Sequence, residues 1–141
     1  MGNTVSEHLR AVHSSLPLSA AEHIVDEAIA VRTKEGLLPL AVAVLDAGGN
    51  LVAFKREDGA GVLRFDVAFG KAWAALGMGM ATRLIRDRMA SRPAFQGALS
   101  AASDGRFIPV PGGVLILDSG GVAIGAVGIS GDASDKDEYC A

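Results

Sequence analysis

The chain has 141 residues, which suits a single domain, and half of them are hydrophobic while only 5% are aromatic. Its net charge of −3 argues against the basic surface that nucleic-acid binding requires. Its single cysteine, Cys140, excludes both an intrachain disulfide and a metal site built from several cysteines. No apolar run approaches the roughly 18 residues of a membrane span, and the first residues, MGNTVSEHLR, lack the pattern of a signal peptide. We therefore predict one cytoplasmic domain over residues 1–141, with 1–17 as an N-terminal extension.

Two capping-box patterns open the sequence. Thr4-Val-Ser-Glu7 predicts a short helix that ends near His13, and Ser19-Ala-Ala-Glu22 predicts a longer one. Apolar residues recur at helical spacing after Ser19, as far as Gly36.

A β-hairpin follows this helix. Leu40–Leu45 and Leu51–Arg56 are predicted strands, and Asp46-Ala-Gly-Gly-Asn50 joins them. Glycine permits positive φ and Asp and Asn bond nearby backbone groups, so the joining segment is typical of a tight turn.

The same pattern returns 72 positions later. Leu-Asp-Ala-Gly-Gly at 45–49 becomes Leu-Asp-Ser-Gly-Gly at 117–121, again between apolar runs. We predict a second hairpin from Val114–Leu117 and Val122–Ile129, structurally equivalent to the first.

Helices are predicted between the hairpins. Arg64–Met80 carries an apolar stripe and Ala81–Ala90 continues it with a more charged face, while Gly77 and Gly79 interrupt the run. Pro93 ends the second helix, and the segment PAFQGALSAAS that begins there is expected to form one further turn or a loop.

The order of elements predicts an α+β fold, an antiparallel sheet built on two hairpins and flanked by helices. Near the end of the chain, Ser134-Asp-Lys-Asp137 is typical of a helix N-cap followed by acids. There is no G-x-G-x-x-G after a strand and no Walker A sequence, which argues against a doubly wound nucleotide fold.

Lys71 is the most suggestive residue for chemistry. Its helix neighbours three and four positions away are Val67, Ala68, Ala74 and Ala75, none of which is an acid. Such a lysine either extends to water or lies in a desolvated pocket with a lowered pKa, where it could donate a proton or bind a carboxylate.

Acidic residues and glycines lie in the loops. Asp46 and Asp118 begin the two turns and are expected to bond the turn backbone. Asp58 follows a strand in Glu-Asp-Gly-Ala-Gly, where Gly59 would let a ligand approach the backbone, although a plain loop explains the residues as well. The amides of Gly112-Gly113 could bind an anion or could serve close strand packing.

Metal and nucleophile motifs are missing from the sequence. The acids between Asp132 and Glu138 lack the spacing of a calcium loop, and we expect a solvated helix start there. No H-x-x-x-H pair and no G-x-S-x-G elbow occurs. His23, on the longer N-terminal helix, is a candidate haem ligand, although a lone helix histidine more often lies at the surface or in the core.

Four ordered motifs resemble the GlcG/HbpS family: LAVAVLDAGGNLVAFKREDGA, GKAWAA, PGGVLI and IGAVGISGDASDKDEYCA. This family includes haem-binding proteins and the C-terminal domain of PduO-type proteins, and the resemblance covers roughly Leu18 to Ala141. It implies homo-oligomers, dimers or higher, and a ligand pocket where the central helix faces the glycine-rich elements. The positions that match are Asp46, Asp58, Gly59, Lys71, Gly112, Gly113, Gly128 and Gly131.

The resemblance implies more than one function. Members are labelled haem-binding or haem-degrading, and others are associated with tautomerase- or hydratase-like proton chemistry on small enolic acids in catabolic pathways. We predict the second: a cofactor-independent lyase or isomerase that acts on a small enolic or vinyl-ether carboxylate. Its catalytic residues would be Lys71 and Asp58, and its substrate-binding residues Arg64, Gly59, Gly112, Gly113 and Asp46.

Two alternatives stay open. One is a haem-binding protein with His23 as axial ligand, and the other is a non-catalytic oligomeric sensor of a small acid. No nucleic-acid or membrane partner and no metal site is expected. The chain departs from the family pattern in a nearly absent C-terminal helix and in SAASDGRFIPVPGG, residues 100–113, where pocket specificity is predicted to lie.

Overall fold

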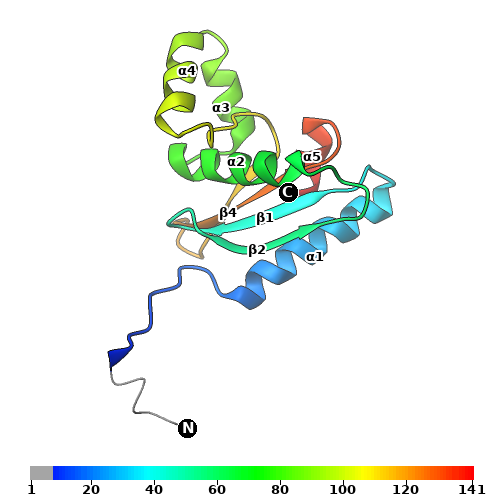
Figure 1. The fold of residues 1–141 in the computed structure, drawn as a ribbon, viewed down its shortest axis with the longest axis vertical. Coiled ribbons are helices and arrows are strands. Elements are labelled where there is room, and N and C mark those ends of the chain that lie inside the picture. The colour runs from blue at the N-terminus through cyan, green and yellow to red at the C-terminus, as the bar shows by residue number, and fades with distance from the viewer. Residues whose placement is uncertain (1–7) are drawn as a thin grey trace.

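The computed structural model describes residues 8–141 and has the predicted α+β architecture (Figure 1). Along the chain, the order is one helix, a hairpin, three helices, a second hairpin and a last helix. Their bounds are α1 Leu18–Glu35, β1 Ala41–Asp46, β2 Leu51–Arg56, α2 Leu63–Met78, α3 Thr82–Met89, α4 Pro93–Ala102, β3 Gly113–Leu117, β4 Ala123–Ser130 and α5 Ser134–Cys140.

The four strands form one antiparallel sheet in the order β2-β1-β4-β3. Each hairpin therefore contributes one central and one edge strand, and the hairpins join through β1 and β4. In that central pair Ala41 lies opposite Ser130 and Asp46 lies opposite Gly125. This register fixes which loops meet at each end of the sheet.

The two hairpin turns are built in the same way, as the sequence repeat predicts. Oδ1 of Asp46 accepts hydrogen bonds at 3.0 Å from the amides two and four residues later, and Oδ1 of Asp118 does the same at 2.8 and 3.0 Å. Gly49 and Gly121 adopt φ values of 80° and 81°, which side chains rarely tolerate. The equivalence of the two turns is confirmed.

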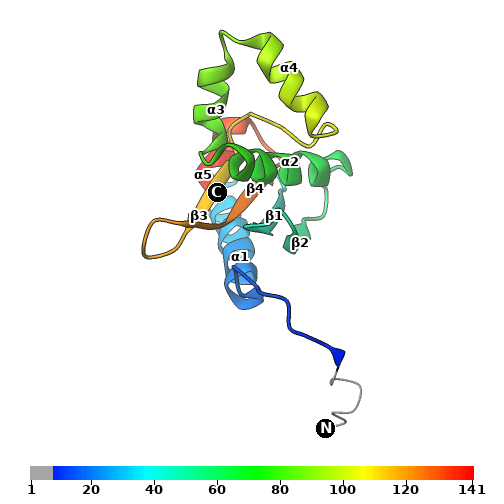
Figure 2. The ribbon, with the colours of Figure 1, turned by 90° about the vertical axis from the view of Figure 1, so that its left-hand side faces the viewer.

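Helices cover both faces of the sheet (Figure 2). On one face α1 buries Val25 and Ala28 against Val42, Val44 and Ile129. On the other face α2 lies across the sheet, and α3 and α4 stack beyond α2, away from the strands (Figures 1 and 2). The molecule thus has a sandwich of helix, sheet and helix with a helical pair on top.

Glycines let α2 lie almost directly on β4. A Cβ at Gly128 would overlap the carbonyl oxygen of Ala68 and would lie 2.8 Å from the amide nitrogen of Ala72. Substitution would push helix and sheet apart, because interiors are close-packed and both contacts are with backbone.

The N-terminal predictions need correction. The first helix begins at Leu18 because the carbonyl of Pro17 accepts the amide of Ala21 at 3.1 Å, so the pattern at Ser19–Glu22 does not cap it. The pattern at Thr4–Glu7 lies outside the described residues, and residues 9–13 are not helical. Instead, the segment is tied to the hairpin ends by Ser15, whose hydroxyl donates to the Ile124 carbonyl and accepts the Ala47 amide, both at 2.9 Å.

Two predictions about short helices were wrong. The segment after Pro93 is a ten-residue helix, α4, rather than one turn or a loop, because a proline suits the first turn of a helix as well as its end. The C-terminal helix that was expected to be nearly absent forms as α5, without a side-chain cap. In residues 8–141, no helix has the length and apolar character needed to cross a membrane.

Candidate functional site

Lys71 is buried in an ion pair between α2 and α5. Only 2% of its side chain is exposed, and its Nζ donates to Oδ2 of Asp137 at 3.1 Å and to the carbonyl of Ile129 at 2.8 Å. Asp137 is 1% exposed, and its other oxygen accepts the amide of Asp132 at 2.9 Å. Of the two states that the sequence left open for Lys71, the desolvated one is observed. The expectation that Asp137 belongs to a solvated helix start was wrong.

The pKa of Lys71 is lowered from its ordinary value of 10.5. Burial is the main cause, because it disfavours the charged ammonium; Asp137 opposes the shift and Arg64 adds a little to it. Gly112 packs against the same ammonium at a φ of 127°, and a Cβ there would lie 2.8 Å from Nζ. The surroundings of Lys71 are thus filled by protein groups, and Lys71 lines none of the cavities described below.

The other residues predicted to bind a substrate are already engaged or lie elsewhere. Nη1 of Arg64 donates to Oγ of Ser130 at 3.0 Å, and the amide of Gly113 donates to Oγ1 of Thr82 at 2.9 Å. Asp46 lies at the far end of β1, where it pairs with Gly125 of β4. It is therefore five strand residues, or roughly 17 Å, away from Ser130.

Asp58 and Gly59 are exposed in the loop between β2 and α2. Gly59 has a φ of 91° and lies beside Pro39, so the loop geometry alone accounts for this glycine. Of the predicted set, the structure brings Lys71 together with Gly112 and Gly113; a Cβ at Gly113 would overlap the carbonyl oxygen of Lys71. Arg64 is near enough to affect the charge of Lys71.

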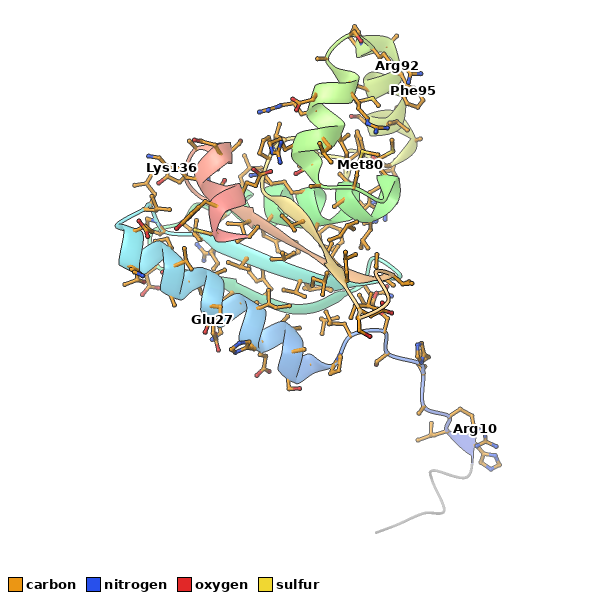
Figure 3. All side chains as sticks on the ribbon, turned by 180° about the vertical axis from the view of Figure 1, so that it is seen from behind. Arg10, Glu27, Met80, Arg92, Phe95 and Lys136 are labelled. Carbon is orange, nitrogen blue, oxygen red and sulfur yellow. The ribbon has the colours of Figure 1, made fainter. Side chains whose placement is uncertain are left out.

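His23, the predicted haem ligand, is exposed on α1. It lies one turn before Glu27, whose side chain points away from the sheet (Figure 3). His23 lines none of the cavities described here. Its proposed role stays a prediction.

An apolar hollow of about 170 Å³ lies between α2, α4 and the segment after α4. Its walls are Trp73, Gly77, Met78, Leu99, Ala102, Ser103 and Phe107. A second hollow of about 180 Å³ adjoins it and shares Trp73 and Gly77, with the β1–β2 turn as its far wall. Trp73 therefore stands between two small hollows at the surface.

Arg106 stands beside the first of these hollows. Its guanidinium lies 4.5 Å from the centroid of the Trp73 ring, and its Nε donates to the carbonyl of Ser103 at 2.9 Å. The loop that carries it is fixed by the hydroxyl of Ser103, which accepts the amide of Phe107 at 3.0 Å. A cation thus lies at the rim of an apolar, aromatic-walled hollow.

Two larger hollows have different chemistry. One, of about 480 Å³, is lined by Glu35, Leu37, Asp135, Lys136 and Tyr139, and its two carboxylates disfavour an anionic ligand. The other, of about 310 Å³, lies between α1 and β2 and includes Glu22 and Lys55. The hollow beside Trp73 is the better candidate for an apolar ligand.

Haem, the cofactor of the alternative hypothesis, can be tested against these residues. It needs apolar or aromatic walls, an iron ligand and a cation for its carboxylates. The hollow supplies Trp73 and Phe107 as walls, the thioether of Met78 as an iron ligand and Arg106 as the cation. The donor set fits haem, whereas the volume admits only an edge of the macrocycle, so the rest would lie over the open mouth.

The residues of this hollow were not predicted from the sequence to form a site. Trp73 carried a signal, since it is the one tryptophan in the chain. The atypical segment at 100–113, where pocket specificity was predicted, contains Ser103, Arg106 and Phe107. Met78 was not among the residues predicted to matter.

Comparison with known proteins gives consistent matches. The family model for haem-degrading HbpS-like proteins matches residues 16–141. An uncharacterised 15.0 kDa protein from the dhaT-dhaS intergenic region of Citrobacter freundii is 30% identical over 128 residues, which are 91% of this chain and 88% of that protein. The crystal structure of Klebsiella pneumoniae protein ORFY has a TM-score of 0.82 and 26% identity over 95% of this chain and 90% of that chain. A crystal structure of PduOC in complex with haem has a TM-score of 0.77 and 25% identity over 89% and 88%.

Proposed function

Because the chain belongs to the family of haem-degrading HbpS-like proteins, we propose that it binds haem at the hollow beside Trp73. The observation that carries the proposal is the combination of aromatic walls, a thioether and a guanidinium around one apolar hollow. The haem complex of PduOC, a structure of the same fold, supports it.

The prediction of proton transfer on a small enolic carboxylate was wrong. The matching family is described as haem-degrading, and a solved structure similar to this chain over most of its length contains haem. The local geometry agrees, since Lys71 is enclosed by Asp137, Ile129 and Gly112 and lines none of the four hollows described above. The lowering of its pKa reflects desolvation inside the fold.

Each wall of the hollow has a definite part in this proposal. Trp73 and Phe107 would contact the edge of the macrocycle, where aromatic faces bury large apolar area. Met78 would supply sulfur to the iron, a ligand type that haem proteins use. Bound haem would bring to the site a redox-active iron that no side chain can supply.

A haem titration tests the proposal directly. The Soret absorbance reports the haem, and the quenching of Trp73, the one tryptophan of the chain, gives a second reading of the same binding. We expect both signals to saturate together at one haem per chain. Saturable haem binding that leaves the fluorescence unchanged would show a different site, and the absence of any Soret shift at excess protein would end the proposal.

Variants identify the iron ligand. Met78→Leu preserves size but removes the sulfur, and should change the Soret position and lower affinity by about tenfold. His23→Ala is the matched variant for the ligand predicted from sequence, and should leave the spectrum unchanged because His23 is exposed on α1. The opposite pattern would transfer the ligand role to His23.

We also propose that the chain forms a homo-oligomer. At the start of α2, Val62 and Leu63 are 83% and 65% exposed. Helix α4 buries none of its residues although most of them are apolar. Exposed apolar surface of this kind is typical of interfaces. Light scattering after gel filtration should give more than one chain per particle, and Val62→Lys should reduce that number if α2 contributes.

A further inference from the structure

The guanidinium of Arg106 is a cation without an acidic partner at the rim of the hollow. Within residues 8–141, Arg32, Arg83 and Arg86 each form an ion pair with a carboxylate, whereas Arg106 contacts the ring of Trp73 and the carbonyl of Ser103. Arg56, Arg64 and Arg92 also have no carboxylate partner, but only Arg106 of these four contacts the Trp73 ring that lines the hollow. We infer that Arg106 is the anion anchor of the hollow and binds a carboxylate arm of the ligand. The inference rests on the proposed function and names the ligand group, the haem propionate, that Arg106 recognises.

The guanidinium is held in place before any ligand arrives. Only its Nε is used, by the carbonyl of Ser103 at 2.9 Å, and its Cζ lies over the Trp73 ring, 4.5 Å from the centroid. An arginine has five N–H donors in a rigid fork, so the two terminal nitrogens can bind a carboxylate through parallel hydrogen bonds. Because stacking restrains the side chain, less conformational entropy is lost when the carboxylate binds.

The hollow selects for a ligand with both an apolar body and an anionic arm. Its volume of about 170 Å³ is below the range of about 300–1,000 Å³ that encloses a whole ligand. Only an apolar edge therefore enters between α2 and α4. The neighbours of Arg106 in the chain, Ser103 and Phe107, both line the hollow, so an arm leaving its mouth lies within reach of the guanidinium.

Two ligands that differ only in their carboxylates separate the contact between Arg106 and the propionate from the rest of the binding. Haem and haem dimethyl ester share the macrocycle and the iron, but the ester carries no carboxylate. Each would be titrated by Soret absorbance and by Trp73 fluorescence against the native chain, Arg106→Met, Arg106→Lys and Arg88→Met. Arg88 is an exposed arginine of α3 that does not contact Trp73, and so provides the matched control for charge.

We expect Arg106→Met to lower the affinity for haem by about tenfold and the affinity for the dimethyl ester by less than about twofold. Changes of this size are expected for one charge-assisted contact at an exposed rim. Arg106→Lys keeps the charge but loses the two parallel N–H donors of the guanidinium. Its affinity for haem should lie between that of Arg106→Met and that of the native chain. Arg88→Met should bind both ligands as the native chain does.

Other results would overturn the inference. If Arg106→Met weakens both ligands equally, the side chain supports the loop and does not bind the propionate. If it weakens neither ligand while the native chain binds haem, the proposed function stands and the inference fails. If the native chain binds neither ligand, haem binding itself is refuted, and the role of Arg106 falls with it.

Discussion

Removing one partner of the buried Lys71–Asp137 pair should destabilise the fold strongly. Asp137→Asn deletes the counter-ion but keeps an oxygen that can accept the Asp132 amide, so the main change is a buried ammonium without its carboxylate. Both side chains are at most 2% exposed, so water cannot solvate the ammonium of Lys71 once the carboxylate is gone. Breaking such a pair costs about 3–5 kcal/mol, a large part of a typical free energy of unfolding of about 5–15 kcal/mol.

The double variant Lys71→Met/Asp137→Asn separates the attraction between the two charges from the cost of burying them. Methionine has a similar length and no charge to desolvate, so we expect the double variant to be less destabilised than the sum of the two single variants by about 2 kcal/mol. Urea denaturation of the four chains gives the coupling energy. The exposed pair Lys55–Asp26 provides the control, and Lys55→Met should leave the urea midpoint nearly unchanged.

The same pair predicts a pH dependence. Because burial makes the pKa of Lys71 lower in the folded chain than its ordinary 10.5, the unfolded chain binds more protons at pH values between the two. The free energy of unfolding of the native chain should therefore rise with pH through that interval, relative to the double variant. Single variants that each cost less than about 1 kcal/mol, or strictly additive effects, would refute this account of the pair.

Three further predictions follow from close packing and burial. Gly128→Ala places a Cβ against the carbonyl of Ala68 and should lower the free energy of unfolding by about 3 kcal/mol in urea denaturation. Gly77→Ala meets nothing closer than 3.9 Å inside a helix and should instead raise it by up to about 1 kcal/mol. Burial raises the pKa of the Cys140 thiol, so alkylation of the folded chain near neutral pH should be much slower than that of the urea-unfolded chain, as mass spectrometry can follow.

Much of the fold could be predicted because its signals are local. Each hairpin turn is specified by an aspartate and two glycines within five residues, and each strand by the adjacent apolar run. The end of α2 was expected near Gly79, which adopts the left-handed conformation there. The start of α1 and the existence of α4 were missed because a proline can either precede a helix or begin one, and tertiary contacts decide between these.

The candidate site depended on contacts that no local pattern encodes. Lys71 and Asp137 are 66 positions apart, and the acid that neutralises Lys71 lies on a seven-residue helix that the sequence did not firmly predict. Trp73 and Arg106 meet only because the α3–α4 pair returns the chain over α2. The sequence correctly indicated that Lys71 has no acid three or four positions away on its own helix. The segment that carries Arg106 attracted attention because it departs from the family pattern.

The two walls of the hollow differ in how firmly they are held. Helix α2 is fixed by the backbone contact at Gly128 and by the buried ammonium of Lys71, so Trp73 and Met78 stand on a rigid support. Helix α4 buries none of its residues, and Arg92 and Phe95 at its outer end contact each other at 4.4 Å on the surface (Figure 3). Segments with few buried contacts open at low free-energy cost. Of the two helices that line the hollow, α4 is therefore the less firmly held, and Leu99 and Ala102 are the wall residues that it contributes.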